Sequence, residues 1–301
     1  MTWRSVVIST PARLKHKHRA LVVQQDSGDI SVPLEDIAVL VIDCPQVTLT
    51  SQLLAACASQ QIAVITVDET HTPNGVLLPY LPHSRALQIM RKQLNMSLPQ
   101  QKRLWQGIIQ QKLANQATVL AQIGHAPQAR HLQQLACNVR SGDPDNLEGQ
   151  GAQVYFRSLF ESPFHRAQSR FFNAALNYGY SVIRSALARS LVGYGFLPAF
   201  GLHHRNEQNA FNLADDLIEP YRPLLDLHVL QHYPTEPERE LEPMDKAGLV
   251  RILHKDVVRI ENRSPAGSST LLALIDATVM SLGQRMGDGD THLVLPGFAE
   301  S

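Results

Sequence analysis

The hydrophobic pattern of this chain changes near residue 70, and that change limits what it can fold into. Before it, short runs rich in Val and Ile alternate with turn residues, as in IAVLVID at 37–43 and IAVITVD at 62–68. A helical segment, SQLLAACASQQ at 51–61, lies between them and completes a strand–helix–strand unit. After residue 85, apolar residues recur at helical spacing. The chain is therefore predicted to be an α+β protein, with a small β-rich N-terminal domain followed by a larger all-helical C-terminal domain.

The domain boundary is predicted in THTPNGVLLPYLPHS at 70–84, because its prolines and glycine are typical of a linker. This gives an N-terminal domain over 1–75, a linker over 76–84, a helical domain over 85–290 and a flexible tail over 291–301. Within the helical domain, we expect helices at 127–140, 146–160, 166–191, 213–219, 245–261 and 267–286.

Composition limits the setting in which the chain works. Its 301 residues are 44 % hydrophobic, enough for a sizeable core in one large domain or two ordinary ones. Cys44, Cys57 and Cys137 show no paired spacing, which favours a reducing, cytoplasmic environment and argues against a structural zinc site. The first residues show no apolar segment of the signal-peptide kind, and no window is apolar enough for a membrane helix.

The net charge is zero, but the charges are unevenly distributed along the chain. Residues 70–142 contain no acidic residue and eight basic ones. A concentrated positive face attracts polyanions whatever the total charge, so this stretch is predicted to contact a polyanion such as nucleic acid. The alternative is a mixed surface on which acids from elsewhere in the sequence lie nearby. The eight residues are Arg85, Arg91, Lys92, Lys102, Arg103, Lys112, Arg130 and Arg140.

Glu148 lies just inside a predicted helix start, in DPDNLEGQGAQVYF at 143–156. With Asp145 three positions earlier it approximates a capping box, in which its carboxylate would bind a backbone amide. Capping does not require Gly149 and Gly151, each of which weakens a helix by roughly 1 kcal/mol relative to alanine. Glycines are tolerated where another chain or a phosphate backbone comes close, which favours a functional interpretation of Glu148.

Histidines and carboxylates recur in GLHHRNEQNAFNLADDLIEPYRP at 201–223. Asn212 is a suitable N-cap for a short helix over 213–219, on which Asp216 and Glu219 share one face. An acid near a helix C-terminus is mildly unfavourable, so Glu219 needs a cation, either a metal ion or Arg222. A histidine with two carboxylates suits Mn²⁺ or Mg²⁺ with open positions, whereas an ordinary solvent-facing loop also accommodates these residue types.

The helix predicted in SRFFNAALNYGYSVIRSALARS at 169–190 combines aromatic, amide and basic side chains. Helical spacing places Arg170, Asn173, Asn177 and Arg184 along one polar stripe. Such a stripe suits contact with a nucleic-acid backbone, although ordinary amphipathicity explains most of it.

Three motifs occur in a fixed order: N-L-E-G-Q-G-A around Glu148, G-L-H-H ending at His204, and D-L-I-E-P-Y-R-P around Glu219. With L-N-Y-G-Y-S-V-I at 176–183, they make most of the chain resemble the CRISPR-associated integrase family, the Cas one proteins. The resemblance implies a protein that inserts new spacers into CRISPR arrays. It also implies an N-terminal β domain, a linker and a helical C-terminal domain.

The resemblance assigns roles to individual residues. It implies that Glu148, His204 and Glu219 are catalytic and hold Mg²⁺ or Mn²⁺, since the family pattern G-x-x-H ends at His204. Asp216 matches the aspartate that opens the last motif and is a secondary candidate ligand, with Asp215 an extra neighbour. The implied reaction is transesterification, in which the 3′-hydroxyl of a spacer precursor attacks a phosphodiester at the edge of a repeat without ATP. His204 would also relay a proton.

Partners follow from the same resemblance. They are double-stranded DNA, a second copy of the chain paired through the β domain, and the small CRISPR protein Cas two. The short loops and the G-L-H-H form resemble the branch that accompanies Cas nine, in type II systems. The residues predicted to contact DNA are Arg85, Arg91, Lys92, Arg166 and Arg170.

Two other functions remain open at this stage. The same residues would serve a metal-dependent nuclease that hydrolyses DNA with water. Alternatively, Glu148, His204 and Glu219 only stabilise the fold of a non-catalytic nucleic-acid-binding scaffold.

Overall fold

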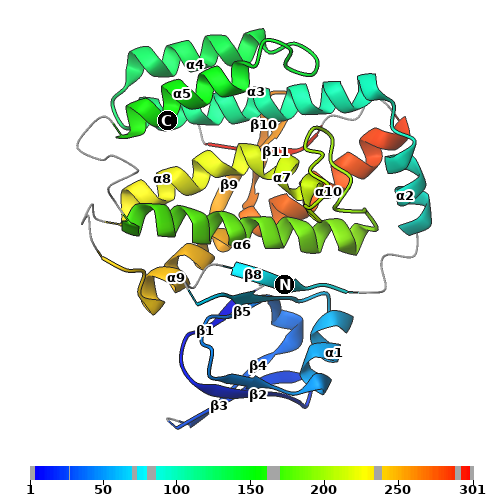
Figure 1. The fold of residues 1–301 in the computed structure, drawn as a ribbon, viewed down its shortest axis with the longest axis vertical. Coiled ribbons are helices and arrows are strands. Elements are labelled where there is room, and N and C mark those ends of the chain that lie inside the picture. The colour runs from blue at the N-terminus through cyan, green and yellow to red at the C-terminus, as the bar shows by residue number, and fades with distance from the viewer. Residues whose placement is uncertain are drawn as a thin grey trace.

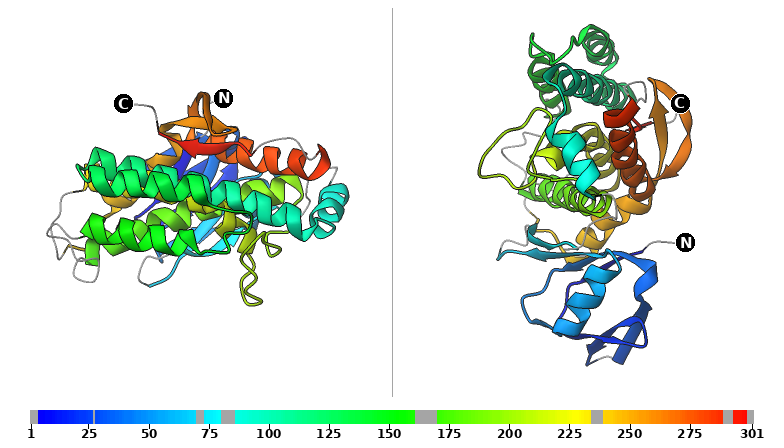
Figure 2. Two further views of the ribbon diagram at one scale, coloured as in Figure 1. Left: turned by 90° about the horizontal axis from the view of Figure 1, so that it is seen from above. Right: turned by 90° about the vertical axis from the view of Figure 1, so that its right-hand side faces the viewer.

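The computed structural model describes residues 4–26, 28–69, 73–79, 86–160, 170–233, 239–288 and 293–298. In this part of the chain, a β-rich N-terminal region lies beneath a larger, mainly helical region (Figure 1). The view from the side shows the same stacking (Figure 2). The predicted α+β class, with a β-rich N-terminal part and a helical C-terminal part, is confirmed.

The described part of the N-terminal region contains two four-stranded sheets and one α-helix. One sheet has the order β1-β5-β7-β8, in which β1, β5 and β7 are parallel, and the other has the order β4-β3-β2-β6. The elements are β1 Arg4–Ile8, β2 Ala12–Lys17, β3 Ala20–Gln25, β4 Gly28–Pro33, β5 Ile37–Ile42, β6 Val47–Leu49, α1 Ser51–Ser59, β7 Ala63–Val67 and β8 Pro73–Leu77.

Strand β5 joins the two regions through its two faces. All six of its side chains, IAVLVI, are buried. Leu40 and Ile42 pack in the core of the N-terminal region, whereas Val39 and Val41 belong to the core of the helical region. An unbroken apolar run is typical of a parallel strand that is covered on both faces. The sheet containing β5 therefore packs against the helical region with one face and against the rest of the N-terminal region with the other.

The helical region is built around two long helices, α3 and α6, and contains a three-stranded antiparallel sheet of order β10-β9-β11. Its elements are α2 Ala86–Leu94, α3 Leu98–Gln122, α4 Ala126–Asn138, α5 Leu147–Phe160, α6 Arg170–Tyr194, α7 Asn212–Ile218, α8 Arg222–His232, α9 Pro243–Val250, β9 Asp256–Glu261, β10 Ser264–Thr270, α10 Leu271–Asp288 and β11 Leu295–Gly297. Among the helices described, none combines the length and apolarity that crossing a bilayer requires.

The prediction of an all-helical C-terminal domain was wrong at one place. The segments expected to be helical at 245–261 and 267–286 begin or end as strands, β9 and β10, which form a hairpin. Asn262 and Arg263 both have positive φ, 48° and 62°, as a tight turn between twisted strands requires. The β-branched residues Val257, Val258 and Ile260 precede this turn, so strand propensity outweighed the helical spacing.

Two segments expected to be irregular are also strands. Part of the predicted linker is β8, which pairs antiparallel with β7 at the edge of its sheet. Pro73 is tolerated there because it is the first residue of an edge strand. In the predicted flexible tail, Leu295–Gly297 is buried and pairs with β9, so this part of the tail is fixed by strand hydrogen bonds. The division of the chain into domains at about residue 75 stays a prediction.

Gly151 allows α5 to approach α3 closely. A Cβ atom at this position would lie 2.2 Å from the Cδ2 atom of buried Leu113 on α3. The predicted reason for the glycines of this segment, access for another chain or a phosphate backbone, is therefore wrong for Gly151. Gly149 likewise packs on the side chain of Asn146. This close approach brings the first turn of α5 next to the middle of α3.

We expect Gly151→Ala to destabilise the protein by about 1–2 kcal/mol, because overpacking Leu113 outweighs the gain in helix propensity. Gly107→Ala is the matched control on α3, since nothing lies within 4 Å of a Cβ atom there. That control should stabilise the protein by about 0.5–1 kcal/mol. Urea unfolding of both variants measures the difference, and equal effects would contradict the packing explanation.

Candidate functional site

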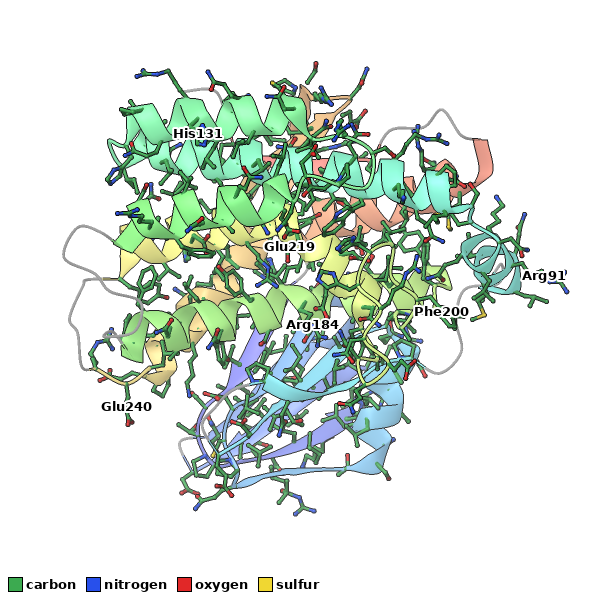
Figure 3. The ribbon with its side chains drawn as sticks, turned by 45° about the horizontal axis from the view of Figure 1, so that its top comes forward. Arg91, His131, Arg184, Phe200, Glu219 and Glu240 are labelled. Atoms are coloured by element: carbon green, nitrogen blue, oxygen red, sulfur yellow. The ribbon has the colours of Figure 1, made fainter. Side chains whose placement is uncertain are left out.

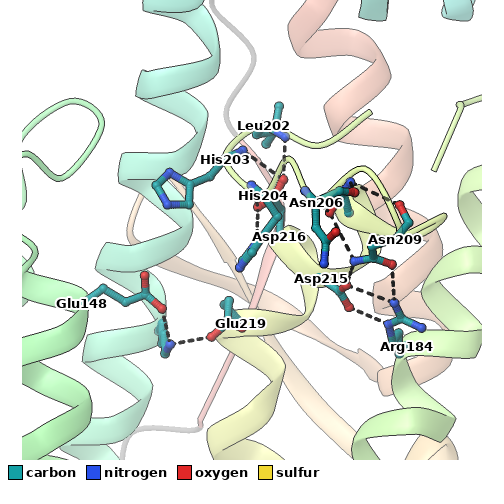
Figure 4. A network of polar contacts seen from close by, with 12 residues as sticks. Glu148, Arg184, Leu202, His203, His204, Asn206, Asn209, Asp215, Asp216 and Glu219 are labelled. Atoms are coloured by element: carbon teal, nitrogen blue, oxygen red, sulfur yellow. Dashed lines mark hydrogen bonds and ion pairs between the residues drawn. The ribbon is translucent and has the colours of Figure 1, made fainter. Parts of the chain in front are cut away.

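Lys112 lies at the centre of the candidate site. It extends from α3, and its Nζ lies 2.7 Å from Oε1 of Glu148 on α5 and also contacts Oε2 of Glu219, just after α7. Oε1 of Glu219 accepts a hydrogen bond of 2.9 Å from Nε of Arg222. We call these four residues the acid–lysine cluster. Figure 4 shows Glu148 and Glu219 facing one another from separate elements.

The charges in the acid–lysine cluster stabilise one another. Burial alone would raise the pKa of Glu219, but the adjacent cations of Lys112 and Arg222 lower it below its usual value. Burial alone would lower the pKa of Lys112, whereas the carboxylates of Glu219 and Glu148 raise it. Both groups are therefore ionised at neutral pH. The pair with Arg222, expected as the structural alternative for Glu219, is present together with an additional cation.

Glu148 is not a capping residue. The amides of Leu147 and Glu148 both donate to the carboxylate of Asp143, at 2.9 Å, and the amide of Gly149 donates to Asn146. Asp145 instead forms an ion pair with Arg140. The structural alternative for Glu148, a capping box with Asp145, is therefore wrong, because Asp143 and Asn146 cap the helix. The Glu148 side chain is left to face Lys112.

Asp216 holds the loop that carries His204. Its Oδ2 accepts from the amides of Leu202 and His203, at 2.5 and 3.1 Å, and its Oδ1 accepts from the amide of His204 at 3.1 Å. Oδ1 also lies 2.7 Å from Nδ1 of the His204 ring. Gly201 permits this wrapping, because a Cβ atom there would lie 2.7 Å from Oδ2 of Asp216. Asp216 thus faces the loop, and fixes the orientation of the His204 ring (Figure 4).

The hydrogen bond to Asp216 raises the pKa of His204 above its usual value, against the opposing effect of burial. With Nδ1 taken by Asp216, Nε2 is the ring nitrogen that remains for another partner. The His204 side chain is 43 % exposed, so the ring lies partly open to solvent.

His203 packs against the protein instead. Its ring stacks on buried Trp105 of α3, with ring centres 4.3 Å apart and planes 2° apart. The two adjacent histidines therefore differ in role, since one ring is held by an aromatic face and the other by a carboxylate.

Asp215 and Arg184 form a separate structural pair. Nε of Arg184 lies 2.5 Å from Oδ1 of Asp215, and Oδ2 of Asp215 accepts from both Arg184 and Asn209. Burial opposes ionisation of Asp215, but the hydrogen bonds from Arg184 and Asn209 lower its pKa. The prediction that Arg184 belongs to a stripe contacting nucleic acid is not supported, because its guanidinium ties α6 to α7. Asn212 is not an N-cap either, since its side chain binds loop atoms of Asn206 and Asn209.

The residues predicted to contact DNA are only partly described. Arg91 and Lys92 lie on α2, and Figure 3 shows Arg91 at the periphery while Glu219 lies inside the helical region. Arg85 and Arg166, and the side chain of Arg170, lie outside the described residues.

Within the described part of the chain, no three His, Cys, Asp or Glu side chains are gathered closely enough to hold a metal ion. The donor types nevertheless fit Mg²⁺ or Mn²⁺, because two carboxylates converge on one point and an imidazole is oriented beside them. The ammonium of Lys112 is the stand-in cation at that point. Sequence reasoning named Lys112 only as one of eight basic residues expected to contact a polyanion, and this is wrong for Lys112, because its ammonium is buried against two acids of the chain. Its burial was open to prediction, since it lies three and four positions after buried Ile109 and Ile108, on the buried stripe of α3. A lysine on such a stripe requires an acidic partner.

Two carboxylates that converge on one cation, in a chain that also presents an oriented histidine, are typical of proteins that act on phosphate esters with a divalent metal. The family model for CRISPR associated protein Cas1 matches residues 6–236. The chain is 45 % identical over 298 residues to the CRISPR-associated endonuclease Cas1 of Neisseria meningitidis, a match that covers 98 % of this chain and 96 % of that protein. The chain therefore belongs to the Cas1 family.

Solved structures share the fold. A casposase bound to integration product matches with a TM-score of 0.73 at 17 % identity, over 95 % of this chain and 90 % of that one. A Cas6-RT-Cas1–Cas2 complex matches with a TM-score of 0.71 at 18 % identity, over 96 % of this chain and 35 % of that one. At this identity, these matches establish the architecture and not the chemistry.

Proposed function

We propose that the protein is a metal-dependent DNA integrase that inserts spacer DNA into a CRISPR array. The observation that carries the proposal is the meeting of Glu148 and Glu219 on one buried cation, beside a histidine that Asp216 orients, in a chain of the Cas1 family. We also propose that the protein belongs to the branch that accompanies Cas nine, on the basis of its short loops and the G-L-H-H form at 201–204.

The proposed reaction exchanges one phosphodiester for another. The 3′-oxygen of the spacer precursor bonds to phosphorus, and the bond from phosphorus to the 3′-oxygen of the nucleotide that flanks the repeat breaks. A proton passes from the attacking oxygen to the leaving oxygen. Because the number of phosphodiester bonds is conserved, no ATP is consumed. When bound, Mg²⁺ or Mn²⁺ supplies Lewis-acid stabilisation of charge on the phosphate oxygens.

The chain's own residues divide the remaining work. We assign Glu148, Glu219 and Nε2 of His204 to hold the cation. Asp216 is a positioning residue, because it sets both the loop backbone and the ring tautomer of His204. Proton relay by His204 would use the same Nε2, so the two roles of this residue alternate and do not coincide.

The proposed partners are double-stranded DNA, a second copy of the chain through the β-rich region, and the Cas2 protein, with a cytoplasmic location. A matched structure is a complex of Cas1 with Cas2, which supports the last of these partners. Arg91 and Lys92 remain candidate DNA contacts, as basic side chains on the peripheral helix α2.

An integration assay tests the proposal. The protein, a short duplex with 3′-hydroxyl ends and a supercoiled plasmid carrying a repeat are incubated with Mn²⁺ or Mg²⁺, with and without Cas2. Joined products that require the 3′-hydroxyl and the metal are expected. The match to a protein named an endonuclease favours hydrolysis as the second candidate, and metal-dependent nicking without joining would establish it. Tight DNA binding without any product would favour the remaining alternative, a non-catalytic nucleic-acid-binding scaffold.

His203→Phe distinguishes the two histidines. Phenylalanine keeps an aromatic face on Trp105, and the backbone amide that donates to Asp216 is retained. We expect the joining rate to stay within about threefold of wild type, because the ring lies outside the proposed catalytic set. A loss as large as that of His204→Ala would contradict the assignment of His204.

A further inference from the structure

Lys112 occupies an unusual position for a lysine. Its side chain is only 9 % exposed, and its ammonium lies between the carboxylates of Glu148 and Glu219. Lysine is rarely buried unless it is paired, and here it is paired with two carboxylates. Counting formal charges, the two carboxylates are balanced by Lys112 and Arg222, so the acid–lysine cluster is neutral as it stands.

We propose that Lys112 is an exchangeable cation, which holds Glu148 and Glu219 together until a divalent metal ion binds between them and displaces its ammonium. The inference rests on the proposed function, since it concerns the same two carboxylates. It goes further by giving a role to a residue that contacts both proposed ligands, and by predicting that this residue opposes metal binding.

Charge is the first reason. A divalent ion added to the neutral cluster, with the ammonium still in place, would leave two uncompensated positive charges in a largely buried site. Like charges at contact distance in such a site repel strongly, since little water is present to screen them. Withdrawal of Lys112 removes one of these charges and frees the position that the metal ion needs.

Geometry shows why Lys112 moves and Arg222 stays. Arg222 binds the other oxygen of Glu219, so it does not lie between the two carboxylates. Its guanidinium also lies 4.7 Å above the ring of Tyr180, which holds it by a cation–π contact. Lys112 carries a compact charge on a flexible stem of four carbons.

The exit for the ammonium lies on the side of Glu148. The Glu148 side chain is 26 % exposed, whereas that of Glu219 is 8 % exposed. The Glu148 side of the acid–lysine cluster is therefore the side that is more open to solvent. A monovalent ion gains nothing by this exchange, because it would replace one positive charge with another. Lys112 thus favours divalent over monovalent ions.

Lys112→Met tests the inference, because methionine has a similar length and no charge. Mn²⁺ binding is measured by calorimetry, and the unfolding temperature is measured with and without Mn²⁺. We expect the variant to unfold several degrees lower without metal, to recover that loss with Mn²⁺, and to bind Mn²⁺ at least about tenfold more tightly than wild type.

Lys246→Met is the matched control. Lys246 is also a buried lysine paired with a carboxylate, Asp43, at 2.9 Å, but this pair links α9 to the end of β5, away from the acid–lysine cluster. The control should lose stability without a larger response to Mn²⁺. Weaker or unchanged Mn²⁺ affinity in Lys112→Met would overturn the inference, and if wild type still joined DNA the proposed function would stand. Wild type that neither binds Mn²⁺ nor joins DNA would overturn both.

A structure of the wild-type protein with Mn²⁺ is a second test of the inference, and it does not require a stable variant. We expect Nζ of Lys112 to lie beyond hydrogen-bonding distance of Glu219 when the ion is bound. An ion bound elsewhere, with Nζ still between the two carboxylates, would overturn the exchange.

Discussion

Glu148→Gln is expected to reduce the rate of DNA joining by about 1,000-fold, equal to about 4 kcal/mol of transition-state stabilisation. Glutamine keeps the shape of the side chain but removes the charge that faces Lys112 and, in the proposed function, the metal ion. Because Glu148 is the more exposed of the two acids, the fold should tolerate the change. The measurement is a single-turnover joining assay in Mn²⁺, with DNA affinity determined in parallel.

Asp145→Asn is the matched control for this variant. Asp145 lies three residues earlier, carries the same charge, and is paired on the surface with Arg140. Surface ion pairs contribute little, so joining should stay within about twofold of wild type. We also expect the DNA affinity of Glu148→Gln to remain within about threefold of wild type. A Glu148→Gln protein that joins DNA within tenfold of wild type would show that this carboxylate is not catalytic.

The local features of the fold were predictable where neighbouring residues determine them. The apolar run of β5 and the start of α5 follow from side-chain pattern alone. The hairpin of β9 and β10 was missed because Asn262-Arg263 is a weak turn signal, and only the positive φ values reveal it. β11 could not be predicted, because its three residues are ordered by pairing with a strand more than thirty positions away.

The candidate site was also predictable only in part. The motifs marked Glu148, His204 and Glu219, but no pattern showed that Lys112 joins the two acids, since its partners lie 36 and 107 positions away in the chain. Gly151 was interpreted as an opening for phosphate, although its neighbour is Leu113. The roles of Lys112 and Gly151 both depend on contacts between residues far apart in the sequence. The sequence-based expectation for Asp216, a secondary ligand, also changes once its four hydrogen bonds are known.

Asp216→Asn is the second change for which we expect a large effect. Asp216 is fully buried, and its two oxygens accept from three backbone amides and from Nδ1 of His204. Asparagine replaces one of these oxygens by an NH₂ group, which is a hydrogen-bond donor. This donor would then face the N–H donors of the loop without an acceptor. A buried polar group without a partner costs about 1–3 kcal/mol, and more near a charge, so we expect a loss of about 3 kcal/mol in the free energy of unfolding.

The same substitution should reduce joining by about 100-fold, because the ring of His204 loses the partner that fixes its tautomer. A control for simple instability is Asp215→Asn, which removes a partly buried carboxylate at the neighbouring position but keeps the hydrogen bonds that Asp216 forms with residues 202–204. That variant should lose stability with a much smaller loss of joining at a temperature where it is folded. Equal losses of joining would show that Asp216 acts through stability alone.

The pH dependence of stability tests separately whether Asp216 sets the protonation of His204. Because Asp216 raises the pKa of His204 in the folded protein, the charged pair contributes stability that is fully present below the pKa of an unfolded histidine, about 6.5. That contribution is lost as pH rises through the higher, folded-state pKa. The stability deficit of Asp216→Asn should therefore be larger at about pH 5.5 than at about pH 8. Histidine NMR should show the pKa of His204 falling in the variant, and an unchanged pKa would mean that the hydrogen bond does not set the protonation of this ring.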